Sequence, residues 1–406
     1  MSARVVVTGM GVVGPLGPDL PRTASALMAG EHGIVPREAT SEGDDIRVHA
    51  PVRGLDVAEH FPRRELHRMD RFAQLAVVAA REAASRAGLE ESVDRDRLAV
   101  LLGTALGGVH SGFEAQQQLT ASGVRRVSPL TIPTMMGNSA AAGVAIDLGA
   151  GGEVVTPVAA CASGTVAIGQ AMRMIRHGEA EVVVAGGSEA MTAPVVYAGF
   201  QNLRALTRAT DPDRASLPFD RDRSGFVMGE GAAALVLEAE DHARARGAAI
   251  LGVVAGYACT DDAHHITAPE ESGAAVQRAI RAALRDAGDD GALVHVNAHG
   301  TGTALNDRVE ARALAAELGD RAVVTSTKSM TGHLAGAAGA LEAVAGLIAL
   351  QEQRVPATVG TRQLDEGIDI DVVLGSARAV AFSTVLSLSL GFGGHNAALV
   401  LRRPEA

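Results

Sequence analysis

Aromatic residues are scarce in this sequence, whose 406 residues include eight phenylalanines, two tyrosines and no tryptophan. Hydrophobic residues still make up 47% of the chain, so its core has to be built from aliphatic side chains. This apolar content excludes a largely disordered protein, and the length allows two or three domain equivalents around a large core. The 47 glycines therefore indicate turns and close backbone approaches.

Cysteine and long apolar runs are scarce as well. Cys161 and Cys259 are the only cysteines and lie in unrelated contexts, which excludes a disulfide framework and favours a reducing compartment. The run "AVAGLIAL" is far shorter than a membrane span, and the apolar run at the start is too short and interrupted for a secretory signal. The sequence predicts a soluble cytoplasmic protein with no membrane partner.

Basic residues are outnumbered, with 36 Lys and Arg against 47 Asp and Glu, which gives a net charge of −11. This balance argues against nucleic acid as the main partner, because phosphate binding needs a basic face. One segment, "PRRELHRMDR" at residues 62–71, nevertheless concentrates Arg63, Arg64, Arg68 and Arg71. It is either a solvated helix start or a docking patch for a small acidic partner.

Strand-like and helix-like segments alternate along the chain. The apolar runs "RVVVTG", "RLAVLLGTA", "AEVVVAGG" and "ALVHVNA" suit strands buried on both faces. Helical periodicity occupies residues 71–88, 164–178 and 274–288, and the last two segments close on a glycine that suits a helix C-terminus. This alternation predicts an α/β protein with helices covering a mostly parallel sheet.

The chain also contains a hint of internal duplication. Residues 154–187 run strand, tight turn, small-residue helix and strand, and residues 323–359 begin in the same order. No linker-like segment separates the two regions. We therefore expect two similar halves, residues 1–250 and 251–406, in one five-layered α/β/α/β/α body.

The glycine spacing of a dinucleotide-binding fingerprint is present, but the surrounding sequence does not fit that motif. Gly9, Gly11 and Gly14 in "VVVTGMGVVGPLG" follow a strand, but Pro15 and Pro18 come at once and favour a loop over a helix start. No strand ending in an acidic residue follows about 20 residues later. A tight strand-to-loop turn is the better interpretation.

Cys161 lies where the strand-like "EVVTPV" meets the helical "SGTVAIGQAMRM". A thiol at a helix N-terminus feels the positive end of the helix dipole, which favours the thiolate, and free N–H groups there can receive an oxyanion. The neighbouring alanines, Ser163 and Gly164 are expected to leave room for an acyl chain and a thioester arm. A buried structural cysteine is the alternative.

Two histidines occupy separate loops rich in glycine and threonine. His299 ends an apolar strand in "VHVNAHGTGT", and His333 lies five residues after Lys328 in "STKSMTGHLAGAAG". A cysteine, two histidines and a lysine suit acyl-thioester chemistry, in which the thiolate takes an acyl group and neutral imidazoles hydrogen-bond a second thioester. A Cys–His–Asn protease arrangement would leave one histidine and Lys328 without a role.

Metal binding is the competing interpretation of the histidines. A third ligand of the kind that zinc requires is not evident, and the lysine argues against a metal site. His264 and His265 are adjacent in "DAHH", but neighbouring side chains of an extended chain point to opposite faces. We interpret this pair as local structure or the rim of a pocket, and we predict no metal site.

Taken together, these motifs resemble the condensing enzymes of the thiolase fold, in particular β-ketoacyl-[acyl-carrier-protein] synthase II and the ketosynthases of type II polyketide systems. The similarity runs nearly from end to end. The segments that carry it are "VVVTGMGVVGPLG", "ACASG", "PFDRDRSGFVMGEGAAALVLE", "VNAHGTGT", "STKSMTGHLAGAAGALEA" and "GFGGHNAALVL".

The resemblance implies a role for each matching residue. Cys161 would accept the acyl group, Phe392 would gate the acyl pocket, and the backbone N–H groups of both would form the oxyanion hole. His299 and His333 would bind the malonyl thioester and promote its decarboxylation. Lys328 with Glu342 and Asp307 would form the supporting network, Thr301 and Thr303 would hold the phosphopantetheine arm, and Arg64, Arg68 and Arg204 would dock the acidic carrier protein.

The sequence departs from the synthase II pattern near the gate. Leu388 and Leu390 replace an asparagine and a phenylalanine before "GFGG", and His395 replaces the threonine that usually follows it. The segments "TVLSLSLGFGG" and "NDRVEA" lean toward polyketide ketosynthases, whereas "KSMTGHLAGAAG" and "DAHHITAP" lean toward fatty-acid synthases. These departures leave the acyl-chain preference open, but not the reaction.

The resemblance implies a decarboxylative Claisen condensation, in which acyl-S-Cys161 and malonyl-carrier protein give 3-oxoacyl-carrier protein and CO₂. Such an acyltransferase needs no cofactor of its own, because acyl carrier protein brings the substrates on phosphopantetheine. It would form a homodimer, or a heterodimer with a chain-length factor in a type II polyketide pathway. The weakest alternatives are a non-catalytic partner subunit, which would lack the cysteine, and an NAD-dependent dehydrogenase.

Overall fold

The computed structural model describes residues 3–89 and 93–404. Eleven strands form one large sheet in the order β12-β10-β9-β14-β15-β8-β1-β7-β6-β4-β5. Their bounds are β1 (Val5–Val13), β4 (Leu98–Gly103), β5 (Val154–Val155), β6 (Val182–Ala190), β7 (Glu230–Ala239), β8 (Gly252–Asp261), β9 (Val294–Asn297), β10 (Ala322–Thr325), β12 (Asp371–Val372), β14 (Thr384–Gly391) and β15 (His395–Arg402). Two small ribbons pair β2 (Val35–Pro36) with β3 (Val48–His49) and β11 (Arg354–Val355) with β13 (Arg378–Ala379).

The helices alternate with these strands along the chain. Their bounds are α1 (Leu20–Ala29), α2 (Arg63–Leu66), α3 (Arg71–Ala87), α4 (Val109–Ser122), α5 (Thr131–Met135), α6 (Ser139–Leu148), α7 (Ser163–Arg176), α8 (Pro194–Asn202), α9 (Glu240–Ala245), α10 (Ala274–Asp286), α11 (Ala304–Leu318), α12 (Lys328–Thr331) and α13 (Ala338–Glu352). The three helices predicted from periodicity are α3, α7 and α10. Gly178 and Gly288 follow α7 and α10 with φ of 74° and 66°, as expected for helix C-termini.

The two halves repeat one topology. The order β5-β4-β6-β7-β1 in the first half matches β10-β9-β14-β15-β8 in the second, and β1 joins β8 through Val5–Val7 and Gly252–Val254. The prediction of two similar halves is confirmed. The sheet is less parallel than predicted, because β6–β7–β1 and β14–β15–β8 pair antiparallel while β5–β4–β6 and β10–β9–β14 pair parallel.

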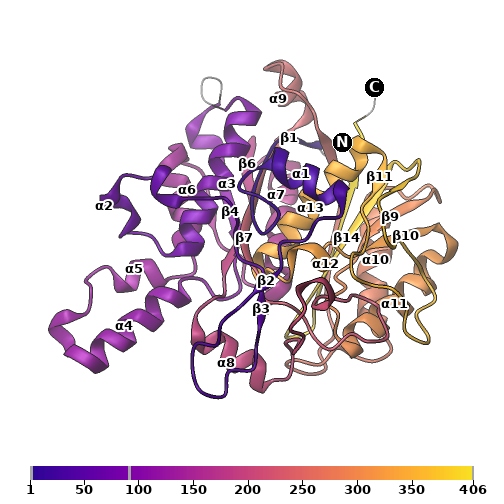
Figure 1. The fold of residues 1–406 in the computed structure, drawn as a ribbon. Coiled ribbons are helices and arrows are strands. Elements are labelled where there is room, and N and C mark those ends of the chain that lie inside the picture. The colour runs from indigo at the N-terminus through magenta and orange to yellow at the C-terminus, as the bar shows by residue number, and fades with distance from the viewer. Residues whose placement is uncertain (1–2, 90–92, 405–406) are drawn as a thin grey trace.

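The helices complete the five layers of the α/β thiolase fold. Helices α7 and α13 contact strands of both halves, whereas the main strand contacts of α3 and α6 are with the first half and those of α10 and α11 are with the second half. In Figure 1, α3 and α6 lie on one side of the molecule, α10 and α11 on the other, and α7 and α13 between them. The largest buried apolar cluster surrounds the two central helices, and two further clusters lie under the outer pairs.

The glycines of the first strand serve packing. A Cβ added to Gly9 or Gly11 would lie 2.1 Å or 2.0 Å from the carbonyl oxygens of Ala83 and Ala79, which belong to α3. Gly14 and Gly17 then pair their backbones in a tight turn, with N···O distances of 2.9 and 3.2 Å. The strand-to-loop interpretation is therefore correct, and the glycine spacing reflects the approach of α3 to β1. No helix among the described residues is long and apolar enough to cross a membrane.

This packing gives a stability prediction. Gly11→Ala places a methyl group against the α3 backbone, so we expect it to lower the free energy of unfolding by about 1–3 kcal/mol in urea titrations. Gly199→Ala is the matched control, because Gly199 lies inside α8 with nothing within 4 Å of the added Cβ. The control should be neutral or stabilise by up to about 1 kcal/mol. Equal stability of the Gly11 variant and wild type would contradict the packing argument.

Candidate active site

Cys161 lies in a short 3₁₀ turn (Ala160–Ala162) between β5 and α7, at the start of the central helix. Ala160 before it has φ of 48°, a conformation that is uncommon for residues other than glycine. Ser163 stabilises the turn, because its hydroxyl donates to Ala160 O (2.7 Å) and accepts from Ala159 N (2.9 Å). The strand-to-helix position predicted for Cys161 is confirmed.

The sequence suggested that the small residues after Cys161 leave room for substrate. The structure instead places Ser163 and Gly164 in packing contacts. Ser163 is fully buried and committed to the turn. A Cβ on Gly164 would lie 2.9 Å from both Gly336 O and Ala340 N, so this glycine allows the start of α13 to approach α7. The clearance interpretation is wrong for these two residues, because the side of the helix that they occupy faces the other half of the protein.

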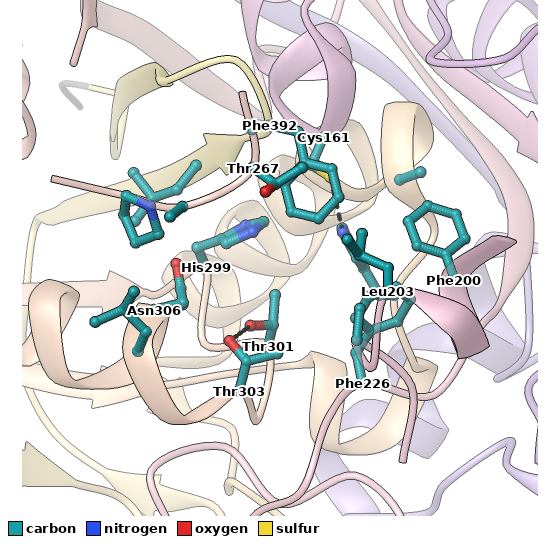
Figure 2. A pocket seen from close by; sticks show the side chains of 18 of the residues that line it. Cys161, Phe200, Leu203, Phe226, Thr267, His299, Thr301, Thr303, Asn306 and Phe392 are labelled. Atoms are coloured by element: carbon teal, nitrogen blue, oxygen red, sulfur yellow. Dashed lines mark hydrogen bonds between the residues drawn. The ribbon is translucent and has the colours of Figure 1, made fainter. Parts of the chain in front are cut away.

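The three predicted reactive side chains converge. His333 Nε2 lies 3.0 Å from Cys161 Sγ, and the rings of His299 and His333 are 5.3 Å apart and nearly perpendicular. Figure 2 shows Cys161 and His299 facing the same cavity, with a dashed line for the cysteine–histidine contact. The nucleophile therefore comes from the first half and both imidazoles from the second.

Backbone contacts fix the orientation of both histidines. The N–H groups of His299 and Gly300 donate to the two carboxylate oxygens of Glu310, at 2.6 and 2.7 Å. His333 N donates to Val227 O (2.7 Å), and Gly229 N donates to His333 O (2.9 Å). The ring of Phe226 packs edge-on against His333, at 5.2 Å. The segment "GFVMGEG" of the first half thus supports a histidine of the second.

Lys328 is buried at the start of α12 and forms an ion pair with the equally buried Glu342. Burial holds the pKa of His299 and His333 well below the ordinary value, and the Lys328 charge lowers both further. Both imidazoles are therefore neutral, so each has one N–H donor and one acceptor nitrogen. Among the described residues, Nδ1 of each has no hydrogen-bond partner.

The thiol of Cys161 is protonated at rest, contrary to the thiolate expected from its helix position. Burial raises its pKa to about 12, although the Lys328 charge and a hydrogen bond from the Phe392 amide oppose this effect. Desolvation disfavours the charged form more strongly than the helix end favours it. The sequence indicated that Cys161 lies at a helix terminus, but not how deeply this terminus is buried.

The cavity beside Cys161 has a volume of about 290 Å³ and two contrasting walls. Phe200, Leu203 and Phe226 form an apolar wall, opposite His299, Thr301 and Thr303 (Figure 2). The hydroxyls of Thr301 and Thr303 are hydrogen-bonded to each other at 2.9 Å. One cavity therefore offers an apolar surface for an acyl chain and hydroxyls for a polar arm.

Phe392, the predicted gate residue, is in the three-residue turn between β14 and β15. A Cβ on Gly391 would lie 3.2 Å from Cys161 N, so the end of β14 reaches the backbone of the nucleophile. The Phe392 amide is directed at the sulfur of Cys161. The Phe392 amide therefore lies close to Cys161, as the expected oxyanion hole requires.

Asp307 supports the histidine loop and does not touch the Lys328–Glu342 pair. Its carboxylate accepts from Gly302 N (3.1 Å) and from Phe219 N (2.8 Å). Phe219 has φ of 64°, an uncommon conformation for a bulky residue. The segment "PFDRDRSGF" is therefore connected to "HGTGT" through this buried carboxylate.

The basic segment has divided roles. Arg71 forms a bidentate ion pair with Glu230 (2.5 and 2.6 Å), which joins α3 to β7. Arg63, Arg64 and Arg68 are exposed on α2 and the turn after it, outside the cavity lining. Arg204 lines the cavity at the end of α8, with φ of 58°. Three of the four segment arginines are therefore exposed to solvent, and Arg64 lies 3.9 Å from Glu65 in an ion pair on the surface.

The remaining sequence candidates lie at the cavity rim. His265 Nδ1 accepts from the amides of Thr267 and Ala268 at 3.1 Å, and both of these residues line the cavity. The rim interpretation of "DAHH" is therefore correct for His265. No group of three or more potential metal ligands is present in residues 3–89 and 93–404.

Sequence reasoning missed two buried carboxylates. Glu310 follows Asp307 by three residues on α11, and this spacing places both acids on one face of the helix. That spacing, directly after "HGTGT", was the available signal. Glu189 on β6 accepts from the amides of Ala105, Leu106 and Gly336 at 2.6–3.2 Å. Its position in an otherwise apolar strand gave no indication of these distant partners.

The chain matches two family models, described as Beta-ketoacyl synthase, N-terminal domain (residues 2–243) and Beta-ketoacyl synthase, C-terminal domain (residues 251–362). It is 44% identical to 3-oxoacyl-[acyl-carrier-protein] synthase 2 of Synechocystis sp., covering 98% of both chains. A Staphylococcus aureus protein of the same description is 41% identical, with 99% of both chains covered.

Solved structures agree with these matches. A β-ketoacyl synthase from Burkholderia phymatum superposes with a TM-score of 0.93 and 36% identity, covering 99% of this chain and all of the other. A type II polyketide ketosynthase bound to a hexaketide, in complex with its acyl-carrier protein, superposes with a TM-score of 0.93 and 32% identity over both full chains. The resemblance stated from the motifs is confirmed: the chain belongs to the β-ketoacyl synthase family, a family of acyltransferases.

Proposed function

We propose that this protein takes an acyl group from acyl carrier protein onto Cys161 and condenses it with malonyl-carrier protein, giving 3-oxoacyl-carrier protein and CO₂. The observation that carries the proposal is the convergence of the Cys161 thiol with two neutral imidazoles in one cavity. Thiol, imidazoles and amide donors are the groups that acyl transfer between thioesters requires.

In the first half-reaction, Cys161 Sγ attacks the acyl thioester while His333 Nε2 accepts the thiol proton. The contact of 3.0 Å suits this transfer. The amides of Cys161 and Phe392 donate to the carbonyl oxygen as it gains negative charge. Collapse of the intermediate expels the carrier-protein thiolate, which takes the proton that His333 had accepted and leaves neutral His333 and acyl-S-Cys161.

In the second half-reaction, His299 and His333 donate N–H hydrogen bonds to the thioester carbonyl of malonyl-carrier protein. For His333 this step requires the tautomer with its proton on Nε2, whereas acylation requires the tautomer in which Nε2 is free to accept a proton. Loss of CO₂ leaves its electron pair on C2 as an enolate, which the two neutral donors stabilise. C2 then attacks the acyl carbonyl and expels the Cys161 thiolate, which takes one proton from water; this proton balances the charge of the malonyl carboxylate lost as CO₂. Lys328 and Glu342 are assigned to positioning, since their ion pair lies beside both histidines.

The carrier protein is the proposed partner for the basic surface. Arg64 on α2, Arg68 in the turn after it and Arg204 at the cavity suit the acidic carrier. Thr301 and Thr303 suit the phosphopantetheine arm. The division of labour remains part of this proposal: residues 1–250 supply the nucleophile, and residues 251–406 supply both histidines.

The assembly is proposed to be a dimer. The ishigamide ketosynthase/chain length factor, at 33% identity and a TM-score of 0.92, illustrates the heteromeric alternative for a polyketide pathway, whereas the synthase 2 relatives favour fatty-acid elongation. A cytoplasmic location and independence from any cofactor other than the carrier's phosphopantetheine complete the proposal. Condensation assays with and without candidate partner subunits distinguish the two pathways.

The first prediction from the proposed function concerns acylation. Cys161→Ala should abolish formation of the acyl-enzyme, because no other side chain in the cavity can take its place as a nucleophile. Intact-protein mass after incubation with acyl-carrier protein measures the adduct. An acyl adduct of undiminished yield on the variant would overturn the assignment of Cys161.

The second prediction separates the two half-reactions. His299→Ala should leave acylation of Cys161 within about threefold of wild type, while lowering CO₂ release from malonyl-carrier protein by about 10²-fold or more, as for loss of a donor to a developing oxyanion. Radiolabelled CO₂ gives the decarboxylation rate directly. Unchanged release would remove His299 from the second step.

The third prediction follows from the raised pKa of the thiol. In a Cys259→Ala background, alkylation of Cys161 by iodoacetamide should accelerate continuously from pH 7 to beyond pH 9, because only the thiolate reacts and its fraction rises toward a pKa of about 12. Mass spectrometry at each pH gives the rate. A rate that levels off below pH 7 would indicate a resting thiolate instead.

A further inference from the structure

Helix α8 forms the apolar wall of the cavity. Phe200 and Leu203 line it across from His299 (Figure 2). The Phe200 ring lies 6.3 Å from the gate residue Phe392 and 5.4 Å from Phe226. The position of α8 therefore sets the space beside the gate that an acyl chain can fill.

Helix α8 depends on its surroundings for that position. It is only nine residues long and has no side-chain hydrogen bond at its N-cap. Helices of this length are marginal on their own, so tertiary contacts have to hold them. The contacts on the side of α8 away from the cavity thus determine how rigidly the apolar wall is held in place.

Those contacts come from residues 37–47, the segment between β2 and β3. The Arg37 guanidinium lies 3.7 Å from the ring centroid of Tyr197, which is one helical turn before Phe200. Gln201 accepts from Asp45 N (2.9 Å) and donates to Gly43 O (2.8 Å). Ile46 packs in the same buried cluster as Tyr197. The segment therefore contacts two consecutive turns of α8.

Arg37 is buried within this segment and hydrogen-bonded to it. Its side chain is 5% exposed and that of its partner Asp44 is 7% exposed. Nη1 donates to both oxygens of Asp44 (2.9 and 3.0 Å) and to Ile46 O (3.0 Å). Burial alone would raise the pKa of Asp44, but hydrogen bonds from Thr40 and Arg37 outweigh it and hold the pKa below the ordinary value. A buried, paired cation thus lies over an aromatic ring, where desolvation strengthens the attraction.

We propose that Arg37 is a positioning residue that, through Tyr197, holds α8 against the cavity and thereby sets the length of acyl chain that Cys161 accepts. The proposal rests on the proposed acyl transfer to Cys161. A short acyl group stays close to Cys161, whereas a long chain extends along the wall that includes Phe200. Loosening α8 therefore impairs acylation by long chains and leaves acylation by short chains nearly unchanged.

The test compares acylation rates of the full-length protein with butyryl- and dodecanoyl-carrier protein, followed by intact-protein mass. Arg37→Met should lower the dodecanoyl-to-butyryl rate ratio at least fivefold. Arg37→Lys retains a cation that can lie over Tyr197 and should keep the ratio within about twofold of wild type. Gln201→Ala removes the second attachment and should shift the ratio in the same direction, which keeps the proposal testable if Arg37→Met does not fold.

Arg81→Met is the matched control. The Arg81 guanidinium also pairs with a carboxylate (Asp147) and lies 4.8 Å from an aromatic ring centroid (Phe61), but it packs on α3, away from the cavity. Its substitution should shift the melting temperature without changing the ratio, since global destabilisation affects both substrates equally. A ratio in Arg37→Met and Gln201→Ala that stays within twofold of wild type, or rises, overturns the proposal, as does an equal change in Arg81→Met. Wild-type protein that accepts no acyl chain at all would instead overturn the proposed function, and this inference with it.

Discussion

The close contact between α7 and α13 in the central layer is the constraint on which the site depends. A Cβ on Gly164 would collide with Gly336 and Ala340, and one on Gly339 would lie 2.0 Å from the Thr165 hydroxyl. Without side chains between them, the starts of two helices from different halves meet. Cys161 and His333, 172 residues apart in sequence, can then lie 3.0 Å from each other. A larger residue at this contact would increase the distance between Cys161 and His333 while leaving both side chains chemically unchanged.

The same contact buries the reacting groups, and burial decides their charges. Desolvation keeps both imidazoles neutral and the thiol protonated, and the one cation among them, Lys328, is compensated by Glu342. A neutral thiol–imidazole pair suits a substrate that arrives as a neutral thioester, because charge then develops only as the reaction proceeds. The donors are oriented in advance by Glu310 and the Val227 backbone, so stabilising that charge requires little rearrangement.

The sequence predicted those parts that local pattern encodes. The strand–turn–helix units around Cys161 and His333 and the three long helices follow from residues near one another in the chain. The convergence of the motif residues was expected from the family resemblance and from their positions at strand ends. The roles of Gly164 and Glu189 depend on contacts with segments distant in sequence, which local pattern does not indicate. Glu310 contacts the nearby residues His299 and Gly300, and its spacing from Asp307 was the signal that could have identified it. The thiol pKa was mispredicted for a related reason. The local sequence predicts that Cys161 lies at a helix terminus, but it does not predict that this terminus is buried between the two halves. The antiparallel pairing of half the sheet likewise follows from long-range topology.

The departures from the synthase II pattern are distributed unevenly over the site. Leu388 is fully buried in the outer apolar cluster of the second half, whereas Leu390, two residues along β14, lines the cavity. His395 pairs across strands with Asp261 (3.4 Å) at the base of the Phe392 turn, and Gly393 N bonds Ile266 O at 2.8 Å. On the side of the histidines, by contrast, the sequence keeps the motifs "VNAHGTGT" and "STKSMTGHLAGAAG" that carry the resemblance. The proposed determinants of chain preference thus lie in loops and helix α8 around the acyl side, and the proposed reacting groups lie in the central layers. This division would let chain preference vary while the reaction stays the same.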